Sequence, residues 1–207
     1  MFATPDAAAR HAELLAGIPR VHEADERAIA ALSDTVTPQG IVGVAALVTV
    51  GVGAALAGAP RLVAILCDVS DPGNAGTVLR VADAAGADAV ILCGSSVDPH
   101  NGKCVRASAG SLWHLPVAVV PTWEEAYAAA RSAGLRVAAT SARGTALTDA
   151  DLAPPTAWAF GSEAHGLPSD AIAAADDVLA VPIPGRAESL NLATAAAVCL
   201  YAHLLRR

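Results

Sequence analysis

The chain has 207 residues, of which 54% are hydrophobic and 16% are charged. This composition excludes an intrinsically disordered protein and supplies enough apolar residues for one good-sized domain, with or without a small additional one. The formal net charge is −7, which counts against a strongly basic nucleic-acid-binding surface but leaves room for a local basic patch.

The first fifty residues alternate short helical and strand patterns. We expect helices near residues 6–16 and 25–33 and strands near residues 20–22 and 40–48. About fifty residues are few for an independent core, so residues 1–50 resemble half of a small α/β domain. The opening residues lack the apolar segment of a secretory signal peptide.

Residues 41–59 carry no charge and are numerous enough to span a bilayer. Their four glycines and few large side chains favour a strand followed by a flexible connector, so we expect a linker at residues 51–60 and no membrane span. The same stretch contains GVGAAL, which begins like a dinucleotide-binding fingerprint. It lacks the third glycine and leaves no room for the helix that would hold a pyrophosphate.

Six nearly continuous apolar runs follow, as expected for parallel strands that helices cover on both faces. We expect strands at residues 61–69, 87–94, 115–120, 135–142, 156–163 and 177–183. Helices are expected at residues 76–85 and 122–133, shortly after Pro168 and along the closing segment. The alternation predicts an α/β domain with a mostly parallel sheet over residues 61–207.

The four cysteines are Cys67, Cys93, Cys104 and Cys199. They form no C-x-x-C pair, and three lie in apolar runs. We therefore expect reduced core cysteines in a cytoplasmic protein and no metal site.

Two short motifs follow predicted strands and contain residues suited to a ligand site. The first, DVSDPGNAGTVLR, contains Asn74 and Arg80 at the start of a predicted helix. The second, FGSEAHGLP, places Glu163 between Gly161 and Gly166, where the backbone can approach a ligand closely. Each motif alone also fits an ordinary turn or helix start.

A third motif, RAESLNLATAAAV, opens the closing helix with Ser189 and Asn191 just after PIPGR. Helix capping explains both side chains, because Ser and Asn accept hydrogen bonds from the unpaired N–H groups of a first turn. A helix N-terminus with polar groups is also suited to a ligand. The fragment by itself leaves both interpretations open.

In this order the three motifs resemble the SpoU (TrmH) group of SPOUT-class RNA ribose 2′-O-methyltransferases. The family patterns are N-x-G-x-x-x-R, then G-x-E-x-x-G-L, then S-L-N after a proline-containing strand, and the resemblance runs roughly from residue 38 to the end. It implies an α/β fold with a C-terminal trefoil knot in which S-adenosylmethionine (SAM) binds. It also implies a homodimer with the active site at the subunit interface.

Many family members begin with a small RNA-binding domain that resembles a ribosomal protein of the L30e type. Residues 1–50 look like only the second half of such a domain. Either the N-terminus is truncated or this chain has a reduced, partial L30e-like segment.

The resemblance implies a role for each matching residue. The catalytic side is assigned to Asn74, Arg80, Glu163, Ser189 and Asn191. SAM is expected at Thr140, Gly161, Gly166, Val181, Ile183 and Leu190. Lys103 and Arg106 lie in a segment expected to contact RNA phosphates.

Arg80 is the base proposed for this family, but arginine stays protonated in nearly all proteins. We therefore expect Arg80 to align the phosphate and to stabilise the developing alkoxide.

The expected function is SAM-dependent methylation of a ribose 2′-hydroxyl in rRNA or tRNA, without a metal. The alternative is a non-catalytic knotted RNA-binding dimer, which the acidic charge and the partial N-terminal segment favour. A dinucleotide-dependent dehydrogenase is a third hypothesis.

Overall fold

The structure is a computed structural model that describes residues 1–206. The chain divides into two compact units, Met1–Leu47 and Val48–Arg207. The second unit contains all three motifs.

The first unit is a small α/β unit with a three-stranded sheet in the order β2-β1-β3, in which β1 is parallel to β2 and antiparallel to β3. Its elements are β1 (Phe2–Ala3), α1 (Pro5–Arg10), α2 (Ala12–Ala16), β2 (His22–Glu23), α3 (Glu26–Leu32) and β3 (Ile41–Val42). The single helix predicted near residues 6–16 is interrupted at His11, and β1 was not predicted. Only a few large side chains, among them Leu15 and Ile29, are buried in this unit.

The predicted linker at residues 51–60 differs from the structure. Strand β4 (Thr49–Val50) pairs in parallel with β7 (Val117–Val120), and helix α4 (Val52–Ala55) follows directly. Ala55 and Leu56 are buried in the core of the second unit, to which they belong, so this stretch packs instead of connecting freely. The small residues of this stretch indicate a flexible connector in the sequence, because the sequence does not show which side chains are buried.

The second unit contains a seven-stranded sheet in the order β10-β8-β9-β5-β6-β7-β4, with every neighbouring pair parallel. Its further strands are β5 (Leu62–Cys67), β6 (Ala89–Cys93), β8 (Arg136–Ala146), β9 (Thr156–Phe160) and β10 (Asp177–Ala180). All six strands predicted from the apolar runs are present, and the mostly parallel sheet is confirmed.

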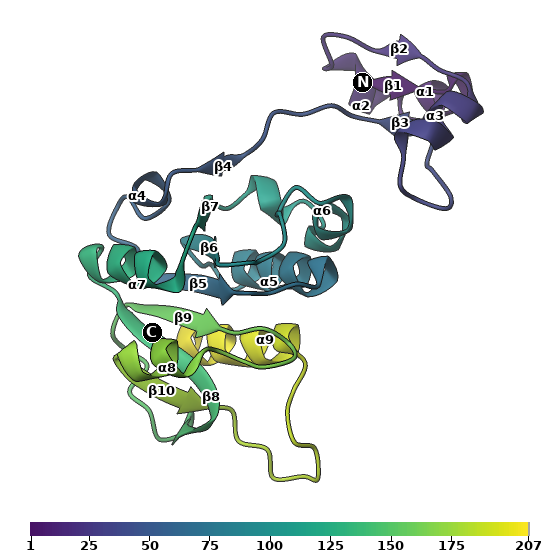
Figure 1. Cartoon of the computed structure of the whole chain (residues 1–207). Coiled ribbons are helices and arrows are strands. Elements are labelled where there is room, and N and C mark those ends of the chain that lie inside the picture. The colour runs from purple at the N-terminus through teal and green to yellow at the C-terminus, as the bar shows by residue number, and fades with distance from the viewer. Residues whose placement is uncertain (207) are drawn as a thin grey trace. The chain divides into compact units, whose positions relative to one another are not determined.

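Helices cover both faces of this sheet (Figure 1). They are α5 (Pro72–Ala84), α6 (Gly102–Ser108), the 3₁₀ turn η1 (Ser111–Trp113), α7 (Trp123–Ser132), α8 (Ser169–Ala174) and α9 (Leu192–Leu204). Helices α5, α6 and α9 pack on one side with Leu62, Ala64 and Leu66 of β5. Helices α4, α7 and α8 pack on the other side with Val63 and Ile65.

Close backbone packing joins α5 to α6, a helix that was not predicted. A Cβ at Gly76 would lie 2.3 Å from the carbonyl oxygen of Cys104 and 2.7 Å from the Cβ of Ala107. Only glycine fits at this contact. The glycine of the first motif therefore has a packing role.

All four cysteines are free and buried, as expected for core residues. No helix within residues 1–206 has both the length and the apolar character needed to cross a bilayer.

Candidate active site

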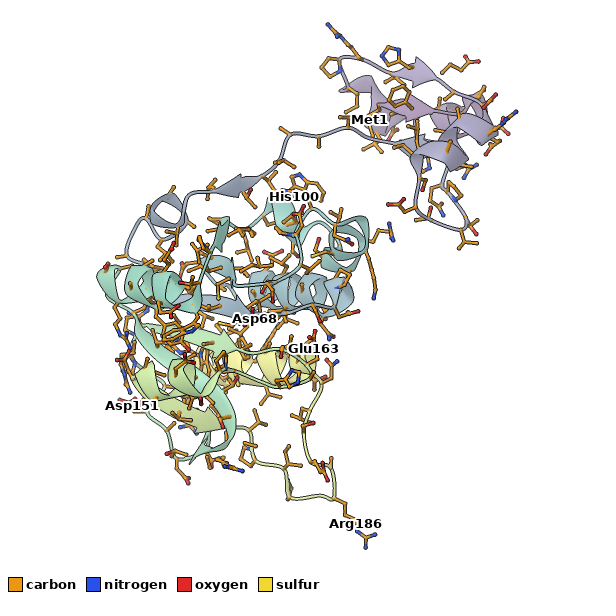
Figure 2. The ribbon with its side chains drawn as sticks, in the orientation of Figure 1. Met1, Asp68, His100, Asp151, Glu163 and Arg186 are labelled. Carbon is orange, nitrogen blue, oxygen red and sulfur yellow. The ribbon has the colours of Figure 1, made fainter. Side chains whose placement is uncertain are left out.

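A pocket of about 560 Å³ opens at the carboxyl ends of the strands, where ligands bind in open parallel sheets. Three segments that are distant in sequence line it: residues 140–142 of β8, residues 160–167 at and after β9, and, from the end of β10 to the start of α9, residues 181, 183 and 188–192. Figure 2 places Glu163 in the middle segment and Arg186 at the tip of the long loop before α9.

Nine of the expected site residues line this one pocket. They are Thr140, Gly161, Glu163, Gly166, Val181, Ile183, Ser189, Leu190 and Asn191. Asn74 is joined to them by hydrogen bonds. The second and third motifs therefore share a site, and the first motif reaches it through one side chain.

A relay of hydrogen bonds connects the three motifs. The Asn191 side-chain oxygen accepts from the backbone N–H groups of Ala193 (2.9 Å) and Thr194 (3.3 Å) at the start of α9. Its side-chain nitrogen therefore faces Asn74 and donates to Oδ1 of Asn74 at 3.1 Å. Asn74 in turn donates from Nδ2 to Oε1 of Glu163 at 2.9 Å. Capping and site formation are thus two functions of the same side chain.

The relay ends at a carboxylate that retains hydrogen-bonding capacity. Within residues 1–206, Glu163 accepts a side-chain hydrogen bond only from Asn74, and its side chain is exposed at the pocket. The remaining carboxylate oxygen can accept a hydrogen bond from a hydroxyl group in the pocket.

The loop after β9 is too tight for any residue but glycine at its first position. A Cβ at Gly161 would lie 2.0 Å from the backbone nitrogen of Leu167. Ser162 and Gly166 exchange two backbone hydrogen bonds of 3.1 and 2.8 Å, and Gly166 has a φ of +70°. The glycines of the second motif close this loop, and Glu163 lies on it.

Asp71 holds the N-terminus of α5, where Asn74 lies. Its Oδ1 accepts from the backbone N–H of Asn74 at 2.8 Å, and its Oδ2 accepts from Nζ of Lys103 at 2.7 Å. The Lys103 ammonium, followed by the Asn74 amide, holds the pKa of Asp71 below its usual value. Lys103 therefore has a structural partner on α5 as well as its expected contact with RNA.

Besides Asn74, three expected residues lie outside the pocket lining. Arg80 is on the exposed side of α5, six residues beyond Asn74, and Arg106 is exposed on α6 with Lys103. The guanidinium groups of Arg80 and Arg106 form no hydrogen bond or ion pair with the residues that the structure describes. Both are therefore available to phosphate.

The sequence-based assignment missed several polar residues of the pocket. Ser141, Ser162, His165 and Glu188 also line it. Ser162 and His165 lie inside the second motif and Glu188 directly precedes the third, so proximity to the motifs was the available signal.

A family model described as the SpoU rRNA methylase family matches residues 61–201. The chain belongs to the SpoU rRNA methylase family. The resemblance inferred from the three motifs is confirmed.

This SpoU-family chain is 35% identical over 179 residues to a 23S rRNA (guanosine(2553)-2′-O)-methyltransferase of Bacillus subtilis, covering 85% of the chain and 69% of that protein. It is 34% identical over 146 residues to a tRNA (guanosine(18)-2′-O)-methyltransferase of Thermus thermophilus, covering 69% of the chain and 73% of the relative. Against another relative, a 23S rRNA (uridine(2479)-2′-O)-methyltransferase of Streptomyces viridochromogenes, the chain spans 50% of that protein's length.

Among solved structures, an AdoMet-bound rRNA methyltransferase from Sinorhizobium meliloti matches this SpoU-family chain with a TM-score of 0.84 and 32% identity. The match covers 98% of this chain and 77% of that one. The parallel α/β fold is therefore that of SpoU methyltransferases.

Proposed function

We propose that this protein transfers the methyl group of SAM to a ribose 2′-hydroxyl of rRNA or tRNA. The observation that carries the proposal is the Asn191–Asn74–Glu163 relay at the edge of a pocket in a SpoU-family fold. The relatives named above act on 23S rRNA and on tRNA, so both classes remain candidate substrates.

The residues of the pocket fit SAM. Its volume of about 560 Å³ lies within the range of about 300–1,000 Å³ usual for small-molecule sites. Val181, Ile183 and Leu190 offer apolar surface for an adenine ring, while Glu163 and Glu188 supply negative charge near a cation. When bound, SAM supplies an electrophilic methyl group carried on a positively charged sulfur.

The chain's own residues would act on the RNA acceptor. Glu163, held by Asn74, accepts a hydrogen bond from the 2′-hydroxyl and orients its oxygen. Ser189 adds a further hydroxyl to the pocket lining. Arg80 binds the adjacent phosphate and stabilises the negative charge that develops on the ribose oxygen. Proton release is completed by solvent, because arginine is too weak an acid to exchange protons at neutral pH.

The decisive experiment is transfer of labelled methyl from SAM to total rRNA and tRNA, followed by mapping of 2′-O-methyl groups. We expect methyl incorporation that is insensitive to a chelator, since within residues 1–206 no three metal-binding side chains converge. The alternative function, a non-catalytic knotted RNA-binding dimer, predicts RNA binding with no incorporation. The aligned relay favours the enzyme, because a protein that only binds RNA has no need to orient a carboxylate in a SAM-sized pocket.

We also propose a homodimer, supported by the outer face of α9. Val198, Tyr201 and Leu205 are spaced three and four residues apart, so they form one exposed stripe, with exposed fractions of 39%, 40% and 80%. The opposite face, with Cys199 and Leu200, is fully buried. A second copy would cover this stripe by an isologous contact.

We also propose that the second unit contains a trefoil knot and that the first unit is a partial L30e-like segment. Support for the knot comes from residues 181, 183 and 188–191, which line one pocket with residues 140–142 and 160–167 before the chain enters α9. Pulling the unfolded chain by both ends tests it: a knot shortens the extended length below about 3.5 Å per residue. An extended length matching all 207 residues would exclude the knot.

The first unit is proposed to bind RNA, supported by its small α/β architecture. We place the protein in the cytoplasm, because its four buried cysteines are all free.

A further inference from the structure

An exposed tryptophan lies on the second unit outside the pocket. Trp113 closes η1 and is 52% exposed, whereas Trp158 is fully buried and Trp123 packs partly buried against Tyr127. Tryptophan combines a large rigid apolar surface with a polar edge, which suits it to contacts with a partner.

The turn that carries Trp113 is held on both sides of it. Leu112 is buried in the core, and His114 hydrogen-bonds to Asp83 of α5, with 2.7 Å between His114 Nδ1 and Asp83 Oδ2. The bonds from His114 and then Ser111 hold the pKa of Asp83 below its usual value, so this anchor stays ionised at neutral pH. The backbone beneath Trp113 is therefore fixed, which lowers the entropy cost of binding through its ring.

The two helices that contact the turn of Trp113 each carry an exposed arginine. Helices α5 and α6 both contact η1. Arg80 lies one turn before Asp83 on α5, and Arg106 lies on α6. As noted above, neither guanidinium has a carboxylate partner within residues 1–206. An exposed aromatic ring, carried on a turn whose neighbouring helices bear exposed arginines, complements a base and its phosphates, because bases stack on aromatic side chains and guanidinium groups bind phosphate.

We propose that Trp113 stacks on a base of the RNA substrate outside the methylated nucleotide, with Arg80 and Arg106 on the adjoining phosphates. The proposal rests on the proposed RNA substrate and adds a contact to it. Asp83 lies nine residues beyond Asn74 in α5, which is about 13.5 Å at about 1.5 Å per residue. That span corresponds to about four stacked nucleotides at about 3.4 Å each, so the stacked base lies a few nucleotides from the reacting ribose.

The test uses the full chain and a dye-labelled oligoadenylate of about twelve nucleotides, a length that covers one or more typical single-strand sites. Fluorescence anisotropy at low salt should give an affinity that falls about 5- to 150-fold in Trp113→Ala, the usual effect of removing one stacked aromatic. Trp113→Phe should retain most of the affinity because it keeps an aromatic face. Val119→Ala removes an exposed apolar side chain of β7 elsewhere on the unit and should have no effect.

Two further measurements separate the outcomes. Calorimetric SAM binding of Trp113→Ala should match the unchanged protein, since Trp113 is outside the pocket. Light scattering should give it an unchanged mass, whereas a loss of dimer would assign Trp113 to a contact between copies and overturn the proposal. Equal oligoadenylate affinity in all variants, or no binding by the unchanged protein, would also overturn it. If Trp113 governs RNA binding but no RNA is methylated, the proposed function fails while the stacking contact stands.

Discussion

Asn191 caps α9 with its side-chain oxygen and orients Asn74 with its side-chain nitrogen. The side-chain oxygen of Asn191 must face the N–H groups of α9, so its side-chain nitrogen faces the side-chain oxygen of Asn74. The side-chain nitrogen of Asn74 is then directed toward Glu163 and donates a hydrogen bond to its carboxylate. The hydrogen bonds that cap this helix therefore also orient the side chains of the site.

Substitution at Asn191 should separate these two roles. Asn191→Ala removes the cap and the donor, so it should lower the free energy of unfolding by about 0.5–2 kcal/mol and also abolish methyl transfer. Asn191→Asp keeps the capping oxygen but not the donor to Asn74, so stability should be retained while transfer is lost. Urea unfolding and labelled-methyl transfer measure the two effects. Full activity in Asn191→Asp would contradict the role of the relay.

Arg80→Ala should abolish methyl transfer while SAM binding stays nearly intact, because Arg80 lies outside the pocket lining. Removing one donor that stabilises developing charge costs about 10²–10³ in rate, and lost alignment adds to this. Arg80→Lys should rescue little, since an ammonium lacks the planar fork that engages two oxygens. The readouts are single-turnover transfer and calorimetry with SAM. Normal turnover of Arg80→Ala on its RNA would refute the assignment.

At the scale of elements, the start of α5 depends on an ion pair with α6. The Lys103 ammonium and then the Asn74 amide lower the pKa of Asp71, so this carboxylate is more easily ionised in the folded state than in the unfolded one. Its contribution to stability is complete above the unfolded pKa and disappears as the pH falls through the lower, folded pKa.

Asp71→Ala should therefore destabilise the protein in a pH-dependent way. At pH 5–8 the loss of the cap should cost about 0.5–2 kcal/mol, and the difference from the unchanged protein should shrink below about pH 4, where the carboxyl becomes protonated. Lys103→Met removes the ion pair but keeps Asp71 as the cap of α5, so it should weaken the pH dependence of stability without abolishing it. Urea unfolding across the pH range is the measurement; a difference that persists at pH 2 would contradict the argument.

The tight loop after β9 makes a second prediction at this scale. A Cβ at Gly161 would meet the backbone of Gly166 and Leu167 at 2.0 Å, so Gly161→Ala must open the loop that carries Glu163. We expect SAM affinity to fall about tenfold or more, which corresponds to about 1.4 kcal/mol. Gly185→Ala is the matched control, because nothing lies within 4 Å of its added Cβ. Calorimetry with both variants decides, and equal affinities would rule out the packing argument.

At the scale of the whole molecule, the outer stripe of α9 predicts the oligomeric state. Light scattering of the full chain at micromolar concentration should give a dimer mass. Tyr201→Glu places a charge in the stripe and should shift the mass toward the monomer, while Thr77→Glu on the exposed side of α5 serves as a control with the same added charge. A monomer mass for the unchanged protein would exclude the dimer.

The sequence by itself determined the parallel α/β unit, because strands buried on both faces are almost entirely apolar, as the central strands β5, β6 and β9 are. It also determined the family, since the three motifs occur together in the order that the family pattern requires. The sequence did not predict four short elements. The elements β1, β4 and α6 have too few residues for a clear periodic pattern. Helix α4 resembles a connector until its contacts with the sheet are known.

Only the tertiary structure decided how the motifs meet. Asn74 and Asn191 are 117 residues apart in sequence, yet their side chains lie within hydrogen-bond distance because β5 and β9 are neighbours and α9 packs on α5. The same packing buried Gly76 against α6 and left Arg80 exposed on the same helix. A sequence pattern specifies which residues follow a strand, whereas the order of strands in the sheet specifies which of those residues share a pocket.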